Sequence, residues 1–261
     1  MNMEYFWETS GSIKKGVGFT HFNTGHLIWL AIFLATCIIC CYCYRKCGET
    51  GRKRFRFTVA GLILLDEAAK WAMLLSTGLW TKNYLPLHLC TINIFLILFH
   101  TVKPSKILDN FLYTICIPAA MMALLFPSWT KLPFMNFMSM HSFSIHILLA
   151  LYPIMLTAGG DIKPRAKYIP KCLLALLCMA IPVYILNELI DTNYMFLAEA
   201  EKGNPLYWFE QNWGNHLLGF PVFMTAIFFV MYAPIEIFIK IKNKKKTSVE
   251  AKETEKEKQV V

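Results

Sequence analysis

The chain has 261 residues, of which 56% are hydrophobic, and a formal net charge of +9. Its mean hydropathy of +0.44 is too high for an ordinary water-soluble domain, so the composition excludes that class of protein. The placement of the basic residues is explained by membrane topology, and we therefore expect no nucleic-acid partner.

Seven segments of the sequence are long and apolar enough to cross a lipid bilayer, which takes about 20 predominantly apolar residues. We therefore predict an all-α, polytopic membrane protein. Its seven transmembrane helices use most of the chain and leave no separate soluble domain. In chain order the predicted spans are residues 26–44, 55–79, 84–102, 107–126, 137–157, 168–190 and 216–239.

Lysine and arginine residues are unevenly divided between the two sides of these spans. Most of them lie in the connections after the first, third and fifth spans and in the C-terminal tail. Basic segments stay in the cytoplasm, so seven spans place the N-terminus outside the cell membrane and the C-terminus inside. We accordingly predict an extracellular segment (1–25), a seven-helix transmembrane domain (26–239) and a disordered basic cytoplasmic tail (240–261).

Polar residues within the spans are predicted to lie in the middle or the outer half of the bilayer. Such residues are costly in lipid and usually face the bundle interior or a wet cavity. We predict one polar cavity that opens toward the outer leaflet and binds or positions a substrate. Its candidate residues are His26, Asp66, Glu67, Lys70, His88, Cys90, Asn93, His141, His146, Tyr184, Asn187, Glu188, Asp191 and Asn193.

Helical spacing limits which of these side chains meet. Asp66 and Lys70 are four residues apart and share a face, so they can pair, either to hold helices in register or to bind a ligand. His141 and His146 are five apart and point to different faces. Cys90 shares a face with Asn93, and Pro86 suits a helix start.

The nine cysteines do not form the pattern of a metal site. Five of them gather at the inner end of the first span, where a reducing cytoplasm disfavours disulfides. No second cluster accompanies them, and the histidines match no local zinc motif. The sequence therefore predicts neither a metal nor a cofactor.

Four motifs carry a resemblance to a known family: "GHLIW" at the start of the first span, "LPLHLCTIN" in the third, "HSFSIH" in the fifth and "NELIDTNYMFL" after the sixth. With them the chain resembles the bacterial YwaF-like integral membrane proteins, whose animal relatives include transmembrane protein 164. The resemblance implies a seven-span fold and acyl transfer between phospholipids. In that scheme a cysteine carries the acyl group and a later histidine assists, which correspond here to Cys90 and to His141 or His146.

This scheme is chemically sound, because a histidine can take the proton of a thiol and return it to the leaving group. We therefore expect a lipid acyltransferase or acyl-ester hydrolase whose partners are membrane lipids. The groups expected to donate to the oxyanion or to position the substrate are Asn93, Tyr184, Asn187 and Asp191.

Two other functions remain open at this stage. A transporter or ligand-binding membrane protein would use the ionisable residues Asp66, Glu67, Lys70 and Glu188, because such groups mark substrate and proton paths. Against it, the sequence has no internal repeat of the kind common in transporters. A structural or assembly protein would use the cavity for no chemistry. The sequence does not determine the oligomeric state.

Overall fold

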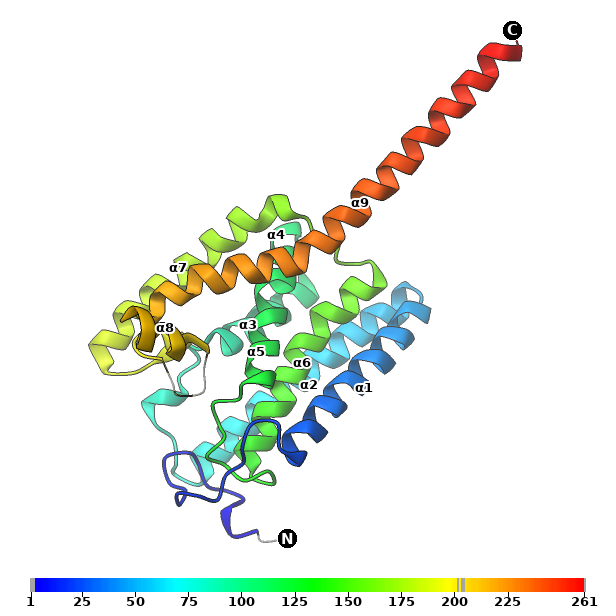
Figure 1. Cartoon of the computed structure of the whole chain (residues 1–261). Coiled ribbons are helices and arrows are strands. Elements are labelled where there is room, and N and C mark those ends of the chain that lie inside the picture. Colours follow the sequence, from blue (N-terminus) through cyan, green and yellow to red (C-terminus); the bar gives the residue numbers. More distant parts are fainter. Residues whose placement is uncertain (1–2, 201, 203–204, 261) are drawn as a thin grey trace.

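The computed structural model describes residues 3–200, 202 and 205–260, and for residues 3, 238, 239 and 242–260 it describes the backbone alone. Over this range the chain is all-helical and contains no β-strand. The α-helices are α1 (Thr24–Lys46), α2 (Glu49–Ser76), α3 (Leu89–Val102), α4 (Lys106–Phe111), α5 (Ile117–Leu125), α6 (Phe137–Gly159), α7 (Ile169–Ile190), α8 (Pro205–Trp213) and α9 (Gly219–Val260) (Figure 1). Short helical turns join them: η1 (Met3–Tyr5), η2 (Lys82–Tyr84), η3 (Leu112–Cys116), η4 (Ala166–Tyr168), η5 (Tyr194–Phe196) and η6 (His216–Leu218).

Six helical segments are long and apolar enough to cross a membrane, and they coincide with six of the seven predicted spans. They are Thr24–Lys46, Lys82–Val102, Lys106–Leu125, Phe137–Gly159, Ala166–Ile190 and His216–Ile237. The exception among the predicted spans is α2. Its 28 residues would extend about 42 Å, but Asp66, Glu67 and Lys70 make it too polar to qualify. The seventh crossing and the orientation of the termini therefore stay predictions.

Helix α6 forms the centre of the bundle and packs against α1, α2, α3 and α5. Phe143, Leu149 and Tyr152 on it are almost completely buried. Asn136 caps its start by accepting a hydrogen bond from the Ser139 N–H at 3.1 Å. A helix that is apolar on all sides is stable when neighbours cover it, and α6 is covered in this way.

The outer helices present apolar side chains to their surroundings. On α1, Leu34 and Ile38 are more than half exposed, and on α7 the same is true of Leu174 and Leu189. A contiguous apolar surface of this kind is unfavourable in water and favourable in lipid. The structure thus supports a multi-span membrane protein.

Segment Lys106–Leu125 is one broken helix made of α4, the π-helical turn η3 and α5. Pro118 follows the π turn, and a proline removes a backbone donor and crowds the preceding turn. The η3 turn also holds α9, because the Tyr113 hydroxyl donates to the Met231 carbonyl at 2.8 Å. The Thr114 and Tyr232 hydroxyls form a second link between them.

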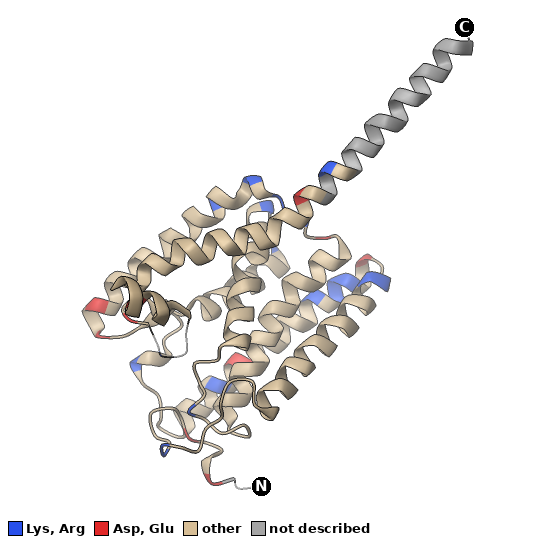
Figure 2. Cartoon of the chain, viewed as in Figure 1, with Lys and Arg blue, Asp and Glu red and all other residues tan. Residues whose placement is uncertain are grey.

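The predicted cytoplasmic end of the bundle is rich in basic residues and is held by ion pairs. Figure 2 shows Lys and Arg gathered around the α1–α2 connection and near the start of α7. Arg52 donates to Asp161 Oδ1 and to the Gly159 carbonyl, both at 2.8 Å. Tyr44 donates to the other oxygen of Asp161. These bonds join the ends of α1 and α6 to the start of α2.

The C-terminal part of α9 extends away from the bundle (Figure 1). The sequence predicted a disordered tail from residue 240, whereas the described backbone is helical to Val260. Lysine and glutamate, which dominate this stretch, are good helix formers. The cytoplasmic location of the tail and the division of the chain at residues 25 and 239 stay predictions.

Candidate functional site

Helices α2 and α6 share a buried network of ionisable residues. His141 Nδ1 lies 3.2 Å from Asp66 Oδ1, and His141 Nε2 lies 3.9 Å from Glu67 Oε2. The Ser144 hydroxyl donates to Asp66 Oδ2 at 2.8 Å. Each ring nitrogen of His141 thus faces a carboxylate oxygen.

Lys70 completes the network. Its Nζ donates to Glu67 Oε1 at 2.5 Å, and the Trp71 indole N–H donates to the same oxygen at 3.0 Å. The predicted Asp66–Lys70 pair is therefore wrong. Residues three and four apart are both within reach on a helix, and Asp66 instead turns toward His141 and Ser144 on α6. The ammonium group of Lys70 thus pairs with Glu67, and Asp66 joins α2 to α6.

His146 lies on another face of α6, as the spacing predicted. Its Nδ1 is 2.6 Å from the Ser142 carbonyl oxygen. Because a carbonyl oxygen only accepts, Nδ1 carries a proton, and in the neutral ring Nε2 therefore carries the lone pair. The described residues provide no hydrogen-bond partner for Nε2. The Trp129 ring stacks on the imidazole, with 5.3 Å between ring centroids, so His146 has one open basic nitrogen on a fixed ring.

Helix α3 begins inside the bundle and places Cys90 in its first turn. The helix has only 14 residues, about 21 Å, so the chain from residue 82 to 88 completes the crossing in a less regular form. Such backbone is tolerated at membrane depth where protein covers it or where it lines a wet cavity. His88 is the N-cap residue of α3, and both His88 and Cys90 are half-buried.

The surroundings of Cys90 come from three helices. Lys70 and Glu67 on α2 are close enough to interact electrostatically with its thiol. Cys116 on η3 is also close enough, and its own thiol donates to the Leu149 carbonyl of α6 at 3.4 Å. Cys90 therefore lies near the ionisable residues of α2 and near the turn of α6 that follows His146.

The histidines also belong to this neighbourhood. His146 is within electrostatic reach of His88, His141 and Asp66, and His88 is within reach of Lys70. The structure thus brings together residues of α2, α3 and α6 that are far apart in the sequence. Most of the candidates predicted for the second, third and fifth spans meet here.

Asn93 lies one turn after Cys90, on the same face of α3. Its side chain is 1% exposed, and its Oδ1 has no hydrogen-bond partner within the described part of the chain. Buried polar atoms without a partner are rare and call for an explanation. A buried amide next to the thiol is available to a bound molecule.

Asn187, near the end of α7, has hydrogen-bond partners for both the oxygen and the nitrogen of its side-chain amide. Its Oδ1 accepts from the Tyr194 N–H at 2.9 Å and from the Thr192 hydroxyl at 3.1 Å, and its Nδ2 donates to the Tyr194 carbonyl at 2.9 Å. These bonds hold the segment after α7, in which Met195 and Phe196 have φ of 58° and 56°. Residues other than glycine seldom adopt positive φ. The amide of Asn187 stabilises this strained turn.

The turn lies against His88. The Met195 N–H donates to His88 Nδ1 at 3.3 Å, and the Tyr194 ring meets the imidazole edge-on at a centroid distance of 5.2 Å. Burial raises the pKa of the Tyr194 phenol, whose hydroxyl donates to the Lys82 carbonyl. The "NELIDTNYMFL" motif thus holds the backbone around His88.

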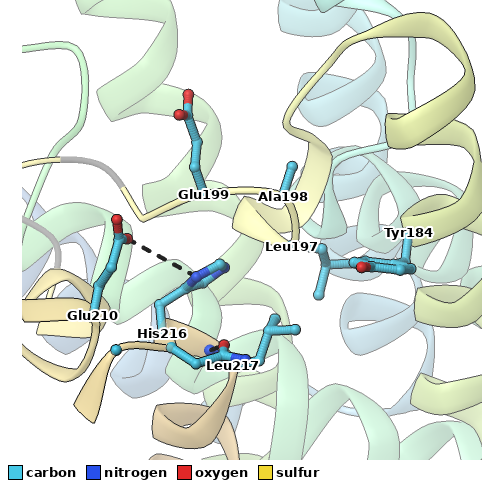
Figure 3. A pocket seen from close by; sticks show the side chains of 9 residues that line it. Tyr184, Leu197, Ala198, Glu199, Glu210, His216 and Leu217 are labelled. Atoms are coloured by element: carbon cyan, nitrogen blue, oxygen red, sulfur yellow. Dashed lines mark hydrogen bonds and ion pairs between the residues drawn. The ribbon is translucent and has the colours of Figure 1, made fainter.

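A pocket of about 310 Å³ is lined in part by residues 197–199, which follow this turn (Figure 3). Its lining includes Tyr184, Glu199, Glu210 and His216. His216 Nε2 donates to the Phe196 carbonyl at 3.1 Å, and its Nδ1 is 3.9 Å from Glu210 Oε2. Tyr184 is the one predicted site residue in this lining. Most of the predicted residues are therefore divided between the α2–α3–α6 cluster, the turn and this pocket.

The chain matches a known protein family over most of its length. The model of the TMEM164 family matches residues 21–232, which include all four motifs and Cys90. The chain belongs to the TMEM164 family. No curated protein and no solved structure matches it. The relationship to TMEM164 inferred from the four motifs is confirmed, while the assignment to a YwaF-like branch stays a prediction.

Other candidates in this TMEM164 family chain have structural partners or lie at the surface. His26 uses both ring nitrogens, because Nδ1 accepts from the Phe22 N–H at 2.8 Å and Nε2 donates to the Leu124 carbonyl at 2.7 Å. Asn193 binds the backbone of the segment that follows it. Glu188 and Asp191 are exposed. Their roles in binding stay predictions.

Sequence reasoning missed several residues that shape this candidate site. Ser144 was not considered, although it lies three residues after His141 and can reach the same helix face. Trp129 stacks on His146 from a loop, and Met195 contributes a backbone N–H. Neither a loop aromatic residue nor a backbone donor leaves a specific signal in a single sequence.

Proposed function

We propose that this TMEM164 family member transfers acyl groups of membrane lipids through a thioester on Cys90. The observation that carries the proposal is a half-buried thiol within electrostatic reach of Lys70, in the cluster of α2, α3 and α6 residues to which His146 also belongs. A nearby cation and a nearby base are the two features that activate a cysteine.

In the first step, the Sγ of Cys90 attacks the carbonyl carbon of a lipid ester. The thiol proton passes to His146 Nε2, the carbon–sulfur bond forms, and the ester carbon–oxygen bond breaks. His146 returns the proton to the departing alcohol oxygen. In the second step, a hydroxyl of a lysolipid attacks the thioester, its proton passes through His146, and the thiol is regenerated. With water as acceptor the same site is a hydrolase.

His146 fits the role of base better than His141. His141 faces carboxylate oxygens with both ring nitrogens, at 3.2 Å from Asp66 and 3.9 Å from Glu67. His146 has Nδ1 fixed on the Ser142 carbonyl, which leaves Nε2 as the acceptor. In this proposal His141 holds α2 and α6 together.

We further propose that α2 is the seventh membrane crossing, with the N-terminus outside a cell membrane. It packs along α6 and α3, and the ion pairs of Asp66, Glu67 and Lys70 lower the cost of placing these residues in lipid. The basic end of the bundle in Figure 2 then faces the cytoplasm. Cys90 and the start of α6 lie toward the outer leaflet, where lipid esters enter between helices.

The experiment is a lipid assay with purified protein in vesicles. The vesicles contain a phospholipid with a labelled acyl chain and an unlabelled lysolipid, and chromatography follows the label. We expect labelled product lipid from wild type and none from Cys90→Ala. Cys178→Ala is the matched control, because Cys178 is exposed on α7, and it should retain wild-type turnover. Equal turnover by folded Cys90→Ala would refute the proposal.

The transport alternative uses the ionisable residues of α2. These residues are engaged with one another and with α6, so helix packing accounts for their presence. Proton-coupled uptake into vesicles that Asp66→Asn abolishes would favour transport over acyl transfer.

A further inference from the structure

We propose that His88 is a second catalytic histidine, which donates a hydrogen bond from Nε2 to the carbonyl oxygen of the lipid ester as that oxygen becomes negative. This inference rests on the proposed acyl transfer at Cys90 and assigns a residue to the stabilisation of its transition state. Donors aimed at a developing oxyanion contribute strongly to acyl-transfer catalysis.

The tautomer of His88 follows from its contact with the turn after α7. The Met195 backbone N–H points at His88 Nδ1 at 3.3 Å. A backbone N–H only donates, so Nδ1 must be the accepting nitrogen of a neutral ring, and the ring proton lies on Nε2. His88 in this state is a donor at its open nitrogen and has no lone pair there to act as a base.

His146 has the opposite tautomer. Its Nδ1 donates to the Ser142 carbonyl, so its open Nε2 accepts. The two histidines are within electrostatic reach of each other. Together they offer the two groups that acyl transfer to a thiol requires, an acceptor for the thiol proton and a donor for the carbonyl oxygen.

The position of His88 in the chain suits this role. It is the N-cap residue of α3, its side chain makes no capping bond, and it stands two residues before Cys90. The first amides of a helix have no intrahelical acceptor and carry partial positive charge. An ester carbonyl attacked by Cys90 at this helix end therefore meets the His88 N–H and the first-turn amides together.

The strained turn after α7 fixes the tautomer of His88 and so makes its Nε2 a hydrogen-bond donor. Met195 and Phe196 hold positive φ, and Asn187 stabilises that conformation with three hydrogen bonds to Thr192 and Tyr194. Non-glycine residues in this region are often found where function requires a particular backbone geometry. Here the geometry directs one N–H at His88, and Asn187 is a positioning residue.

Two reactions of the Cys90 thiol distinguish a His88 that donates to the oxyanion from a His88 that acts as a general base. Alkylation of Cys90 by iodoacetamide needs a thiolate but forms no oxyanion. Acylation by a lipid ester needs the thiolate and also forms an oxyanion that must be stabilised. We expect His88→Ala to lower Cys90 acylation about 10²–10³-fold and to leave alkylation within about threefold of wild type. His88→Gln keeps a side-chain N–H and should recover part of the acylation. His146→Ala should lower both reactions.

Two results would overturn the inference. Wild-type acylation by folded His88→Ala means that His88 donates nothing to the reaction, and a parallel loss of alkylation means that His88 acts as a base or supports the fold. An absence of any Cys90 thioester in wild type would instead refute the proposed function. Nitrogen-15 NMR of the ring gives a check that needs no variant: the proton should lie on Nε2 of His88, and a proton on Nδ1 contradicts the proposal.

Discussion

The α2–α6 network and the start of α3 are neighbours, but they differ in how many of their polar atoms have a hydrogen-bond or ion-pair partner. In the network, each carboxylate of Asp66 and Glu67 has a partner, and both nitrogens of His141 face carboxylates. At the start of α3, His88 has one partnered nitrogen and Asn93 has an amide oxygen with no partner in the described chain. Cys90 belongs to the start of α3.

This difference separates residues that hold the bundle together from residues available to a substrate. A satisfied buried network fixes the relative positions of helices and is costly to break. Buried groups with open hydrogen-bonding capacity are destabilising unless another molecule completes them. We therefore expect substitutions at the start of α3 to change turnover, and substitutions in the network to change stability.

The largest effect on turnover is expected for Cys90→Ser. A serine hydroxyl is a far weaker nucleophile at neutral pH, so transfer should fall about 10³-fold or more. The lipid assay measures the loss, and thermal unfolding in detergent should match wild type because the change is nearly isosteric. Turnover above about a tenth of the wild-type value would show that the thiol carries no acyl group.

His146→Ala comes next. Removing the general base should lower turnover about 10²-fold or more, with a smaller effect on substrate affinity. His141→Gln is the comparison, because His141 belongs to the network and should lose stability first. If His141→Gln lowers turnover of the folded protein more than His146→Ala, the assignment of the base is reversed.

Asn187→Ala should have an intermediate effect. The variant frees the Tyr194 backbone, and the Met195 N–H no longer points reliably at His88, so turnover should fall about 10-fold through loss of orientation. The expected spectroscopic signature is a mixture of His88 tautomers in nitrogen-15 NMR. A reduced turnover with an unchanged His88 tautomer would show that Asn187 does not act through His88.

Asp66→Ala should change turnover least and stability most clearly. It leaves His141 and Ser144 without their acceptor, which should cost about 1–3 kcal/mol of unfolding free energy. Turnover per folded molecule should stay within about threefold of wild type. Glu188→Ala, at an exposed position of α7, is the stability control. Equal melting temperatures for the two variants would contradict a stabilising network.

Much of the fold follows from hydropathy, and the sequence predicts it well. The span predicted at 137–157 is α6 at Phe137–Gly159, and the span at 107–126 is the broken helix Lys106–Leu125. Such runs are long enough for composition alone to locate them. The π turn before Pro118 was not predicted, because hydropathy does not distinguish one helical hydrogen-bonding pattern from another.

The sequence named most of the residues that gather in the α2–α3–α6 cluster, but it predicted less well which of them pair. The sequence correctly separated the surroundings of His141 and His146, since these depend on helical period. It did not predict that Asp66 binds Ser144 while Lys70 pairs with Glu67. On a helix, residues three and four apart can both pair, and contacts with α6 determine which pair forms. The bond from Met195 to His88 joins positions that only tertiary structure brings together.

The most direct test of the account is mass spectrometry of Cys90 itself. Purified wild-type protein is incubated with vesicles of a phospholipid with a labelled acyl chain, digested, and examined for a thioester before and after hydroxylamine, with Cys90→Ser beside it. The account predicts an acyl group on the peptide that contains Cys90, removed by hydroxylamine and absent from the variant. Turnover of the same lipid by the wild type with no acyl group on Cys90 at any time point would contradict it.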